Sequence, residues 1–210
     1  MDYYKKILEV SNILLNKEGC SIDTNIFLKN RVQLSLSKQI PAAYHPFYEQ
    51  IKQVNINWTL PKYKKLPNVC GKINILPAEK VFSDWEGIVW FKGIPETYHL
   101  KDFKVLDFFV NEACVGFYNI EGKTEELHYL YFEEEPIPLG INLEGYCQLL
   151  SLSYGFFYWQ SAIVELITKK KSQESKDFKR YMPKLFSDFS YPQFVEVYNQ
   201  VRIKNLLNTP

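Results

Sequence analysis

The chain has 210 residues and carries 25 Lys and Arg against 24 Asp and Glu, a formal charge of +1. A protein that follows nucleic-acid phosphates needs a strong basic excess, so this balance argues against nucleic acid as a partner. Hydrophobic residues make up 46% of the chain, which suits one globular domain, and the 15 Phe, 15 Tyr and 4 Trp exceed the needs of a core. Because aromatic side chains often anchor interfaces, this surplus favours a binding surface.

The four cysteines are scattered singly along the chain, at Cys20, Cys70, Cys114 and Cys147. Without a C-x-x-C pair, this spacing predicts free thiols in a reducing compartment. The N-terminus has no apolar stretch typical of a signal peptide, and no run approaches the length of a membrane helix. We therefore expect a cytoplasmic protein without a membrane-spanning segment.

The first third of the chain predicts helices followed by a strand. An apolar period of 3.6 predicts a helix that ends near Gly19, through Tyr3, Ile7, Val10 and Leu14. Residues 20–30 allow more than one structure, and residues 32–36 fit either a strand or a short helix. A second helix is predicted from Pro41 to about Gln53, with Phe47, Ile51 and Val54 facing inward.

Alternating residues then predict short strands at 55–60, 70–77 and 88–91, with a helical turn at 78–85. Aromatic and β-branched residues dominate the stretch from Phe103 to Phe132, which is typical of strands joined by a hairpin. Its segment Ala113–Ile120 is apolar at nearly every position and predicts a central strand with both faces covered. We expect four of its residues in the core, namely Val115, Phe117, Leu130 and Phe132.

From Asn142 onward the apolar period changes from 2 to 3.6. Asn142 is predicted to cap a helix, and further helices are expected around 156–167, around 178–185 with a break or restart at Pro183, and from Pro192. The whole pattern predicts a single α+β domain over residues 1–210, with a mostly antiparallel central sheet flanked by N-terminal and C-terminal helices.

The common catalytic motifs are absent from the sequence, including phosphate loops, H-E-x-x-H and G-x-S-x-G. Two hydrolase alternatives stay open. One pairs the carboxyl groups of Asp107 and Glu112, although we expect Glu112 to lie in a turn. The other pairs Cys114 with His128 on a neighbouring strand, although nothing near Cys114 lowers the pKa of its thiol. We expect no catalytic residue, no cofactor and no metal ion.

Two clusters of charge interrupt the apolar pattern. Three lysines surround Tyr63 in the loop at 61–67, which resembles a small nucleic-acid contact but more often marks a solvated loop. Glutamates gather before and after one predicted strand, at Glu121, Glu125 and Glu126 and at Glu133, Glu134 and Glu135. Charges at strand ends beside aromatic residues are placed where they can steer a partner.

The segment 70–77, Cys-Gly-Lys-Ile-Asn-Ile-Leu-Pro, followed by Trp85, resembles the SUKH superfamily, also described as the Smi/Knr-type domain. The preceding Ile40-Pro41 and Phe47-Tyr48 fit that pattern, as do the later segments Val115-Gly116-Phe117, Pro136-Ile137-Pro138-Leu139 and Ile141-Asn142-Leu143 with Tyr146. The resemblance covers about residues 30–155 and leaves 156–210 as a helical extension. The chain departs from the family where Asn55-Ile56-Asn57 replaces the usual Asn-Gly turn.

The resemblance implies an α+β fold without catalysis. In bacteria such domains are commonly immunity proteins that neutralise a cognate toxin by covering its active site, and the near-neutral charge argues against a strongly basic nuclease as that toxin. The alternative within the family is a regulatory or scaffold module. We expect a protein partner to be bound by Trp58, Tyr63, Glu125, Glu126, Glu133, Glu134 and Glu135.

Overall fold

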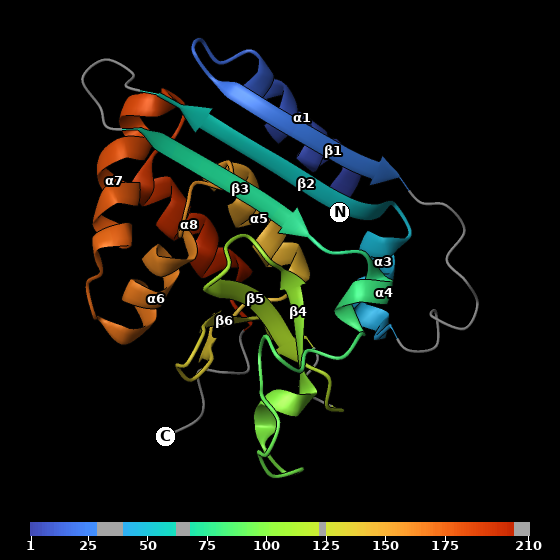
Figure 1. The fold of residues 1–210 in the computed structure, drawn as a ribbon. Helices are drawn as coiled ribbons and strands as arrows, with labels where there is room; N and C mark the ends of the chain where they lie inside the picture. Colours follow the sequence, from blue (N-terminus) through green and yellow to red (C-terminus); the bar gives the residue numbers. More distant parts are fainter. Residues whose placement is uncertain (29–39, 62–67, 122–124, 204–210) are drawn as a thin grey trace.

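The computed structural model describes residues 1–28, 40–61, 68–121 and 125–203 (Figure 1). Within these residues seven antiparallel strands form one sheet, and each strand pairs with the next one along the chain. The strands are β1 (Ser21–Leu28), β2 (Ile51–Leu60), β3 (Val69–Ile75), β4 (Phe103–Asp107), β5 (Ala113–Tyr118), β6 (His128–Tyr131) and β7 (Ile137–Pro138).

Helices from both ends of the chain flank this sheet, which confirms the predicted α+β fold class with an antiparallel sheet. In Figure 1, α1 and α5 lie behind β1, β2 and β3. The α-helices are α1 (Tyr3–Leu15), α3 (His45–Tyr48), α4 (Ala78–Val81), α5 (Leu143–Ser153), α6 (Gln160–Thr168), α7 (Gln173–Leu185) and α8 (Tyr191–Val201). The described residues also form the short 3₁₀ helices η1 (Ala42–Tyr44) and η3 (His99–Asp102).

Buried and less buried residues alternate along β2, so the two faces of the first half of the sheet have different surroundings. Val54, Ile56 and Trp58 are buried, whereas the residues between them, Asn55 and Asn57, are only half-buried. Since side chains alternate across a strand, one face packs its apolar residues into the core and the other presents polar ones. The pattern continues along β3, where Ile73 and Ile75 are buried.

In the second half of the sheet, β5 is buried more completely than the strands of the first half. In β5 every residue from Ala113 to Phe117 is buried, which confirms the predicted central strand. The ring of Tyr44 stacks on Phe117 with 4.4 Å between centroids. Of the four residues expected in this part of the core, Val115, Phe117 and Leu130 are buried and Phe132 is half-buried.

The two halves of the sheet meet at Asp107. The register joins β3 to β4 through Ile75 and Asp107 alone, and the Asp107 side chain extends this contact because its Oδ1 accepts a hydrogen bond from the Asn74 amide at 2.9 Å. The Tyr146 hydroxyl on α5 donates to the Asp107 Oδ2 at 2.7 Å. The buried carboxylate of Asp107 therefore connects both halves of the sheet to α5. The predicted cap of α5 is also confirmed, since the Asn142 side chain accepts a hydrogen bond from the Gly145 amide at 2.9 Å.

Two sequence predictions are wrong in this region. The helix expected to reach Gln53 ends at Tyr48, because the chain from Ile51 onward pairs with β1 as a strand. The three apolar residues are buried as expected, but only Phe47 lies on a helix, whereas Ile51 and Val54 lie on β2. The strand expected at 88–91 is also not formed, since the turn here leaves a single bridge between Glu86 and Trp90.

Smaller differences concern the ends and breaks of helices. Helix α1 ends at Leu15, and Gly19 lies in the turn before β1 with a φ of 74°. Helix α7 continues through Pro183 without a restart. Residues 20–30, which allowed more than one structure, contain β1. The expectations for residues 32–36 and for Tyr63 lie outside the described residues.

Candidate functional site

A cleft of about 620 Å³ opens between the segment 87–100 and the turn that joins β6 to β7. We call it the acidic cleft. Its apolar lining comprises Ile88, Trp90, Phe91, Tyr98, Phe108 and Phe132, and its rim carries Glu133, Glu134 and Glu135. A concave site with aromatic walls and a few grouped charges is the usual form of a recognition site.

The first wall forms because the chain after α4 folds back on itself instead of adding a strand to the sheet. Trp85 is buried and its indole donates to the Val81 carbonyl at 3.0 Å, which fixes the start of the segment. Gly87 has a φ of 81°, a left-handed conformation that favours glycine, and its amide donates to the Trp90 carbonyl at 2.7 Å. This turn presents Phe91, which is 60% exposed.

The second wall is the acidic turn after β6. The Phe132 amide donates to the Glu112 carbonyl at 2.8 Å, and the Glu134 amide donates to the Tyr131 carbonyl at 3.0 Å. Glu133 adopts a left-handed φ of 70° between these two anchors. The backbone of the turn is thus held by hydrogen bonds while its three carboxylates remain exposed.

A polar contact connects the two walls, since the His99 Nε2 lies 3.0 Å from the Glu135 Oε2. The floor between them is aromatic, with Phe108 packed against Trp85 at 6.2 Å and against Phe132 at 6.1 Å between ring centroids. The two sides of the cleft are therefore joined by both apolar and polar contacts.

The charge of the cleft is negative. Its described lining contains three glutamates and neither lysine nor arginine. Close to the lining, the Lys101 ammonium lies 5.0 Å from the centre of the Trp90 ring and 2.8 Å from a Glu96 carboxylate oxygen, so its charge is already matched. The arrangement suits a ligand that combines apolar groups with positive charge.

The predicted site residues lie in different parts of the structure. Glu133, Glu134 and Glu135 lie together in the cleft, whereas Glu125 and Glu126 lie before β6, at its opposite end. Burial raises the pKa of Glu126, although its carboxylate accepts a hydrogen bond from the Gly140 amide. The predicted acidic cluster is thus two separate groups, and one of them lines the cleft.

Trp58 is not placed to contact a partner. Its side chain is 1% exposed, its indole donates to the Tyr154 carbonyl at 2.7 Å, and its ring meets Phe186 edge-on at 5.9 Å. We correct the expectation accordingly, because this tryptophan joins β2 to the C-terminal helices as part of the core. Tyr63, the remaining aromatic candidate, lies outside the described residues.

The carboxyl groups proposed for a hydrolase occupy unlike surroundings. Asp107 is 1% exposed, and burial raises its pKa to about 6 although hydrogen bonds from Tyr146 and Asn74 oppose the shift. Glu112 is exposed and accepts a hydrogen bond from the Tyr158 hydroxyl. One carboxyl group is part of the core and the other lies on the surface, so they do not share an open pocket.

Burial also argues against the alternative that pairs Cys114 with His128. Cys114 is fully buried, and burial raises the pKa of its thiol well above the ordinary value, so the reactive thiolate is disfavoured. The register places Cys114 opposite Leu130 and His128 opposite Gly116. The His128 ring packs edge-on against Tyr118 at 5.0 Å. Among the described residues, no group of three or more His, Cys, Asp or Glu is placed to hold a metal ion.

Sequence reasoning missed the aromatic half of the cleft, above all Trp90, Phe91 and Phe108. A signal was present, since Phe91 follows Trp90 between two glycines, Gly87 and Gly93, which favour a turn over a strand. What the sequence does not reveal is that this turn lies against the glutamates some forty residues later.

Comparison with known proteins finds no family model, no curated protein and no solved structure that matches this chain. The described helices include none with the length and apolar character needed to cross a membrane.

Proposed function

We propose that the protein is a non-catalytic binding protein that acts as an immunity protein. It neutralises a cognate bacterial toxin in the cytoplasm by covering the toxin's active site. The acidic cleft is its contact surface: aromatic side chains on one wall anchor the toxin, and the carboxylates on the other wall select it by charge. The proposal combines the resemblance to the SUKH superfamily with the chemistry of this cleft.

The observation that supports the proposal most is the exposure of Phe91 beside three grouped glutamates. An aromatic side chain that is 60% exposed forgoes burial, although the chain has built a large aromatic core. Its neighbours in the cleft, Trp90 and Phe132, are only half-buried. An apolar patch bordered by charge is typical of a surface that a protein partner covers.

The surroundings of the titratable residues support binding rather than catalysis. Asp107 acts as a structural tie between the sheet and α5, and Cys114 lies within the covered strand β5. Both residues would need to reach solvent and a substrate to act as catalytic groups. The carboxylates that do reach solvent in the cleft share it with aromatic side chains, and its described lining contains no cysteine, serine or threonine that could act as a nucleophile.

Purification of the tagged chain from its native host tests the proposal. A partner protein that arrests growth when produced alone is expected to co-purify, and co-production of this chain is expected to restore growth. If no such protein is captured and production of the chain protects no cell, the proposal fails. Capture of a partner that does not arrest growth would favour the regulatory or scaffold alternative instead.

A further inference from the structure

A second hollow adjoins the acidic cleft at Glu134. It measures about 300 Å³ and is lined by the tyrosine rings of Tyr129, Tyr131 and Tyr158, with Glu174 at the start of α7. We call it the tyrosine hollow. Glu134 lines both the acidic cleft and this hollow, so its side chain stands at the point where the two meet.

A third hollow adjoins the tyrosine hollow at Tyr158 and Glu174. It measures about 430 Å³, and its outer side is formed by Asp177 and Tyr181 on α7. The acidic cleft, the tyrosine hollow and this third hollow are therefore consecutive. We call the row of three the groove.

Charge is distributed unevenly along the groove. Its described lining carries five carboxylates and one amine, the carboxylates being Glu133, Glu134, Glu135, Glu174 and Asp177 and the amine Lys170. The chain as a whole is nearly neutral, so the groove concentrates negative charge that the composition conceals. A surface with this excess of negative charge attracts basic side chains and repels phosphate.

Aromatic rings follow the same path as the carboxylates. Tyr131 is 41% exposed, and the hydroxyl of Tyr158 donates to the Glu112 carboxylate, which holds that ring beside the shared wall of the second and third hollows. A guanidinium group can stack on such rings while it bonds to a neighbouring carboxylate. The groove thus offers both kinds of contact at successive positions.

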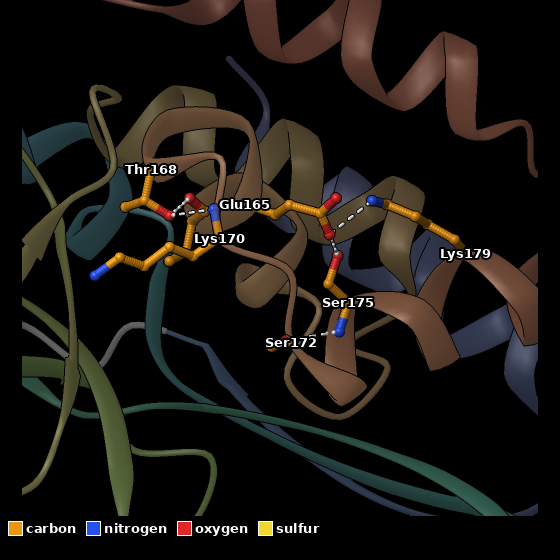
Figure 2. A network of polar contacts seen from close by, with 7 residues as sticks. Glu165, Thr168, Lys170, Ser172, Ser175 and Lys179 are labelled. Carbon is orange, nitrogen blue, oxygen red and sulfur yellow. Dashed lines mark hydrogen bonds and ion pairs between the residues drawn. The ribbon is translucent and has the colours of Figure 1, made fainter.

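The far wall of the groove is anchored to α6. Figure 2 shows that Glu165 receives a hydrogen bond from the Ser175 hydroxyl at 2.6 Å and an ion pair from Lys179 at 2.8 Å. The Ser172 hydroxyl caps α7 by accepting from the Ser175 amide at 3.0 Å. Glu174 lies between these two anchored residues, so its place in the groove is set before a partner arrives.

We infer that the groove binds an extended segment of the partner in which basic side chains are interspersed with apolar ones. This inference rests on the proposed function insofar as the partner is a protein. Apolar side chains of the segment enter the hollows, and its arginine or lysine side chains bond to the carboxylates along the rim. Glu134 is the central contact because it serves two hollows at once.

A labelled peptide tests the inference on the full chain. The probe is a short fluorescein-labelled peptide in which arginine and leucine alternate, and its binding is followed by fluorescence anisotropy. Two peptides serve as controls, one with glutamate in place of arginine and one with serine in place of leucine. We expect the arginine–leucine peptide to bind at low salt, with an affinity that falls as salt rises, and the controls to bind at least about tenfold more weakly.

Three charge-reversal variants locate the contact. Glu134→Lys and Glu174→Lys are expected to weaken binding at least about tenfold. Glu9→Lys changes the net charge equally at an exposed position of α1, outside the groove, and is expected to change affinity by less than about twofold. Circular dichroism of each variant is the control that tests whether it remains folded.

The inference is wrong if the glutamate–leucine peptide binds as well as the arginine–leucine peptide, or if Glu134→Lys binds like Glu9→Lys. An unchanged affinity of Glu174→Lys would also overturn it, because the contact would then end at Glu134. These outcomes are separate from the proposed function. If Glu134→Lys still captures and neutralises a toxin, the groove inference fails alone; if the peptides bind as expected and no toxin exists, the proposed function fails alone.

Discussion

The Nε2 of His99 lies 3.0 Å from the Oε2 of Glu135, and this polar contact joins the two walls of the acidic cleft. His99 belongs to η3 on the aromatic side, whereas Glu135 ends the acidic turn after β6. Two segments far apart in the sequence are thereby held at a fixed separation. The contact positions the cleft more than it stabilises the fold, since the Glu135 side chain is exposed and the His99 side chain is only half-buried.

The first prediction separates these two roles. Glu135→Gln is expected to lower the free energy of unfolding by less than about 1 kcal/mol, as is usual for an exposed ion pair. It is expected to weaken binding of the arginine–leucine peptide, because a charge and a tie between the walls are both lost. Glu79→Gln is the matched control, since Glu79 forms an exposed ion pair with Lys52 at the same distance of 3.0 Å, outside the cleft. Urea unfolding and anisotropy measure both effects, and equal affinities for the two variants would contradict this role of Glu135.

The second prediction uses intrinsic fluorescence. Trp90 is the one tryptophan of the four that is not buried, and it lines the acidic cleft. The emission of the protein is therefore expected to change when the arginine–leucine peptide binds, and Trp90→Phe should abolish that change while anisotropy still reports binding. A Trp90→Phe variant with the same change in emission would mean that the peptide binds elsewhere.

The third prediction concerns pH and the buried carboxyl group of Asp107. Its pKa in the folded protein is about 6, above the value of about 3.9 in an unfolded chain, because burial disfavours the charged form. Between these values the folded state binds more protons than the unfolded state. The contribution of Asp107 to stability is thus fully present below about pH 4 and is lost as the pH rises through about 6, with a total change of about 3 kcal/mol.

Asp107→Asn should remove this pH dependence. The asparagine Oδ1 can still accept from the Asn74 amide, and its amide group can donate to the Tyr146 hydroxyl in place of the present opposite bond. The Gln160 amide now donates its Nε2–H to the Tyr146 hydroxyl at 3.0 Å, and its buried Oε1 has no hydrogen-bond partner in the described part of the chain. If this amide turns over in the variant, its Oε1 can accept from the Tyr146 hydroxyl. Urea unfolding should show the variant gaining stability relative to the wild type from pH 4 to pH 7. A difference that stays constant with pH would contradict the assignment.

Much of the fold could be predicted from the sequence, because several elements obey local rules. The Asn142 cap and a covered strand over Ala113–Ile120 were both predicted, and the strand forms as Ala113–Tyr118, since a capping side chain and an unbroken apolar run leave few alternatives. The helix predicted over 41–53 was too long, because Phe47, Ile51 and Val54 fit a helical period although only Phe47 lies on a helix. Ile51 and Val54 belong to β2, which pairs with β1. Strand pairing is a long-range choice that a short window cannot reveal.

Only the acidic side of the candidate site could be predicted from the sequence. Glu133, Glu134 and Glu135 were recognisable as a charge cluster at the end of a strand. Their aromatic partners come from the segment 87–100, from Phe108 after β4 and from Tyr158 before α6, and only the tertiary fold brings these together. Composition gave no hint of the local charge, because 25 basic residues elsewhere offset the acidic ones.

The fourth prediction tests the correction made for Trp58. Trp58→Phe removes the indole bond to the buried Tyr154 carbonyl and is expected to lower the free energy of unfolding by about 1–3 kcal/mol. Because the ring lies in the core, the folded variant should bind the arginine–leucine peptide like the wild type. Unchanged stability together with weakened binding would restore Trp58 as a contact residue.

The most direct test of the account is the affinity of the captured toxin for the wild-type chain, Glu134→Lys and Glu9→Lys, measured by isothermal titration calorimetry. We predict that Glu134→Lys binds at least about tenfold more weakly than the wild type and no longer protects cells, while Glu9→Lys remains within about twofold. Equal affinities for all three proteins would contradict the claim that the acidic cleft is the surface by which this protein recognises its partner.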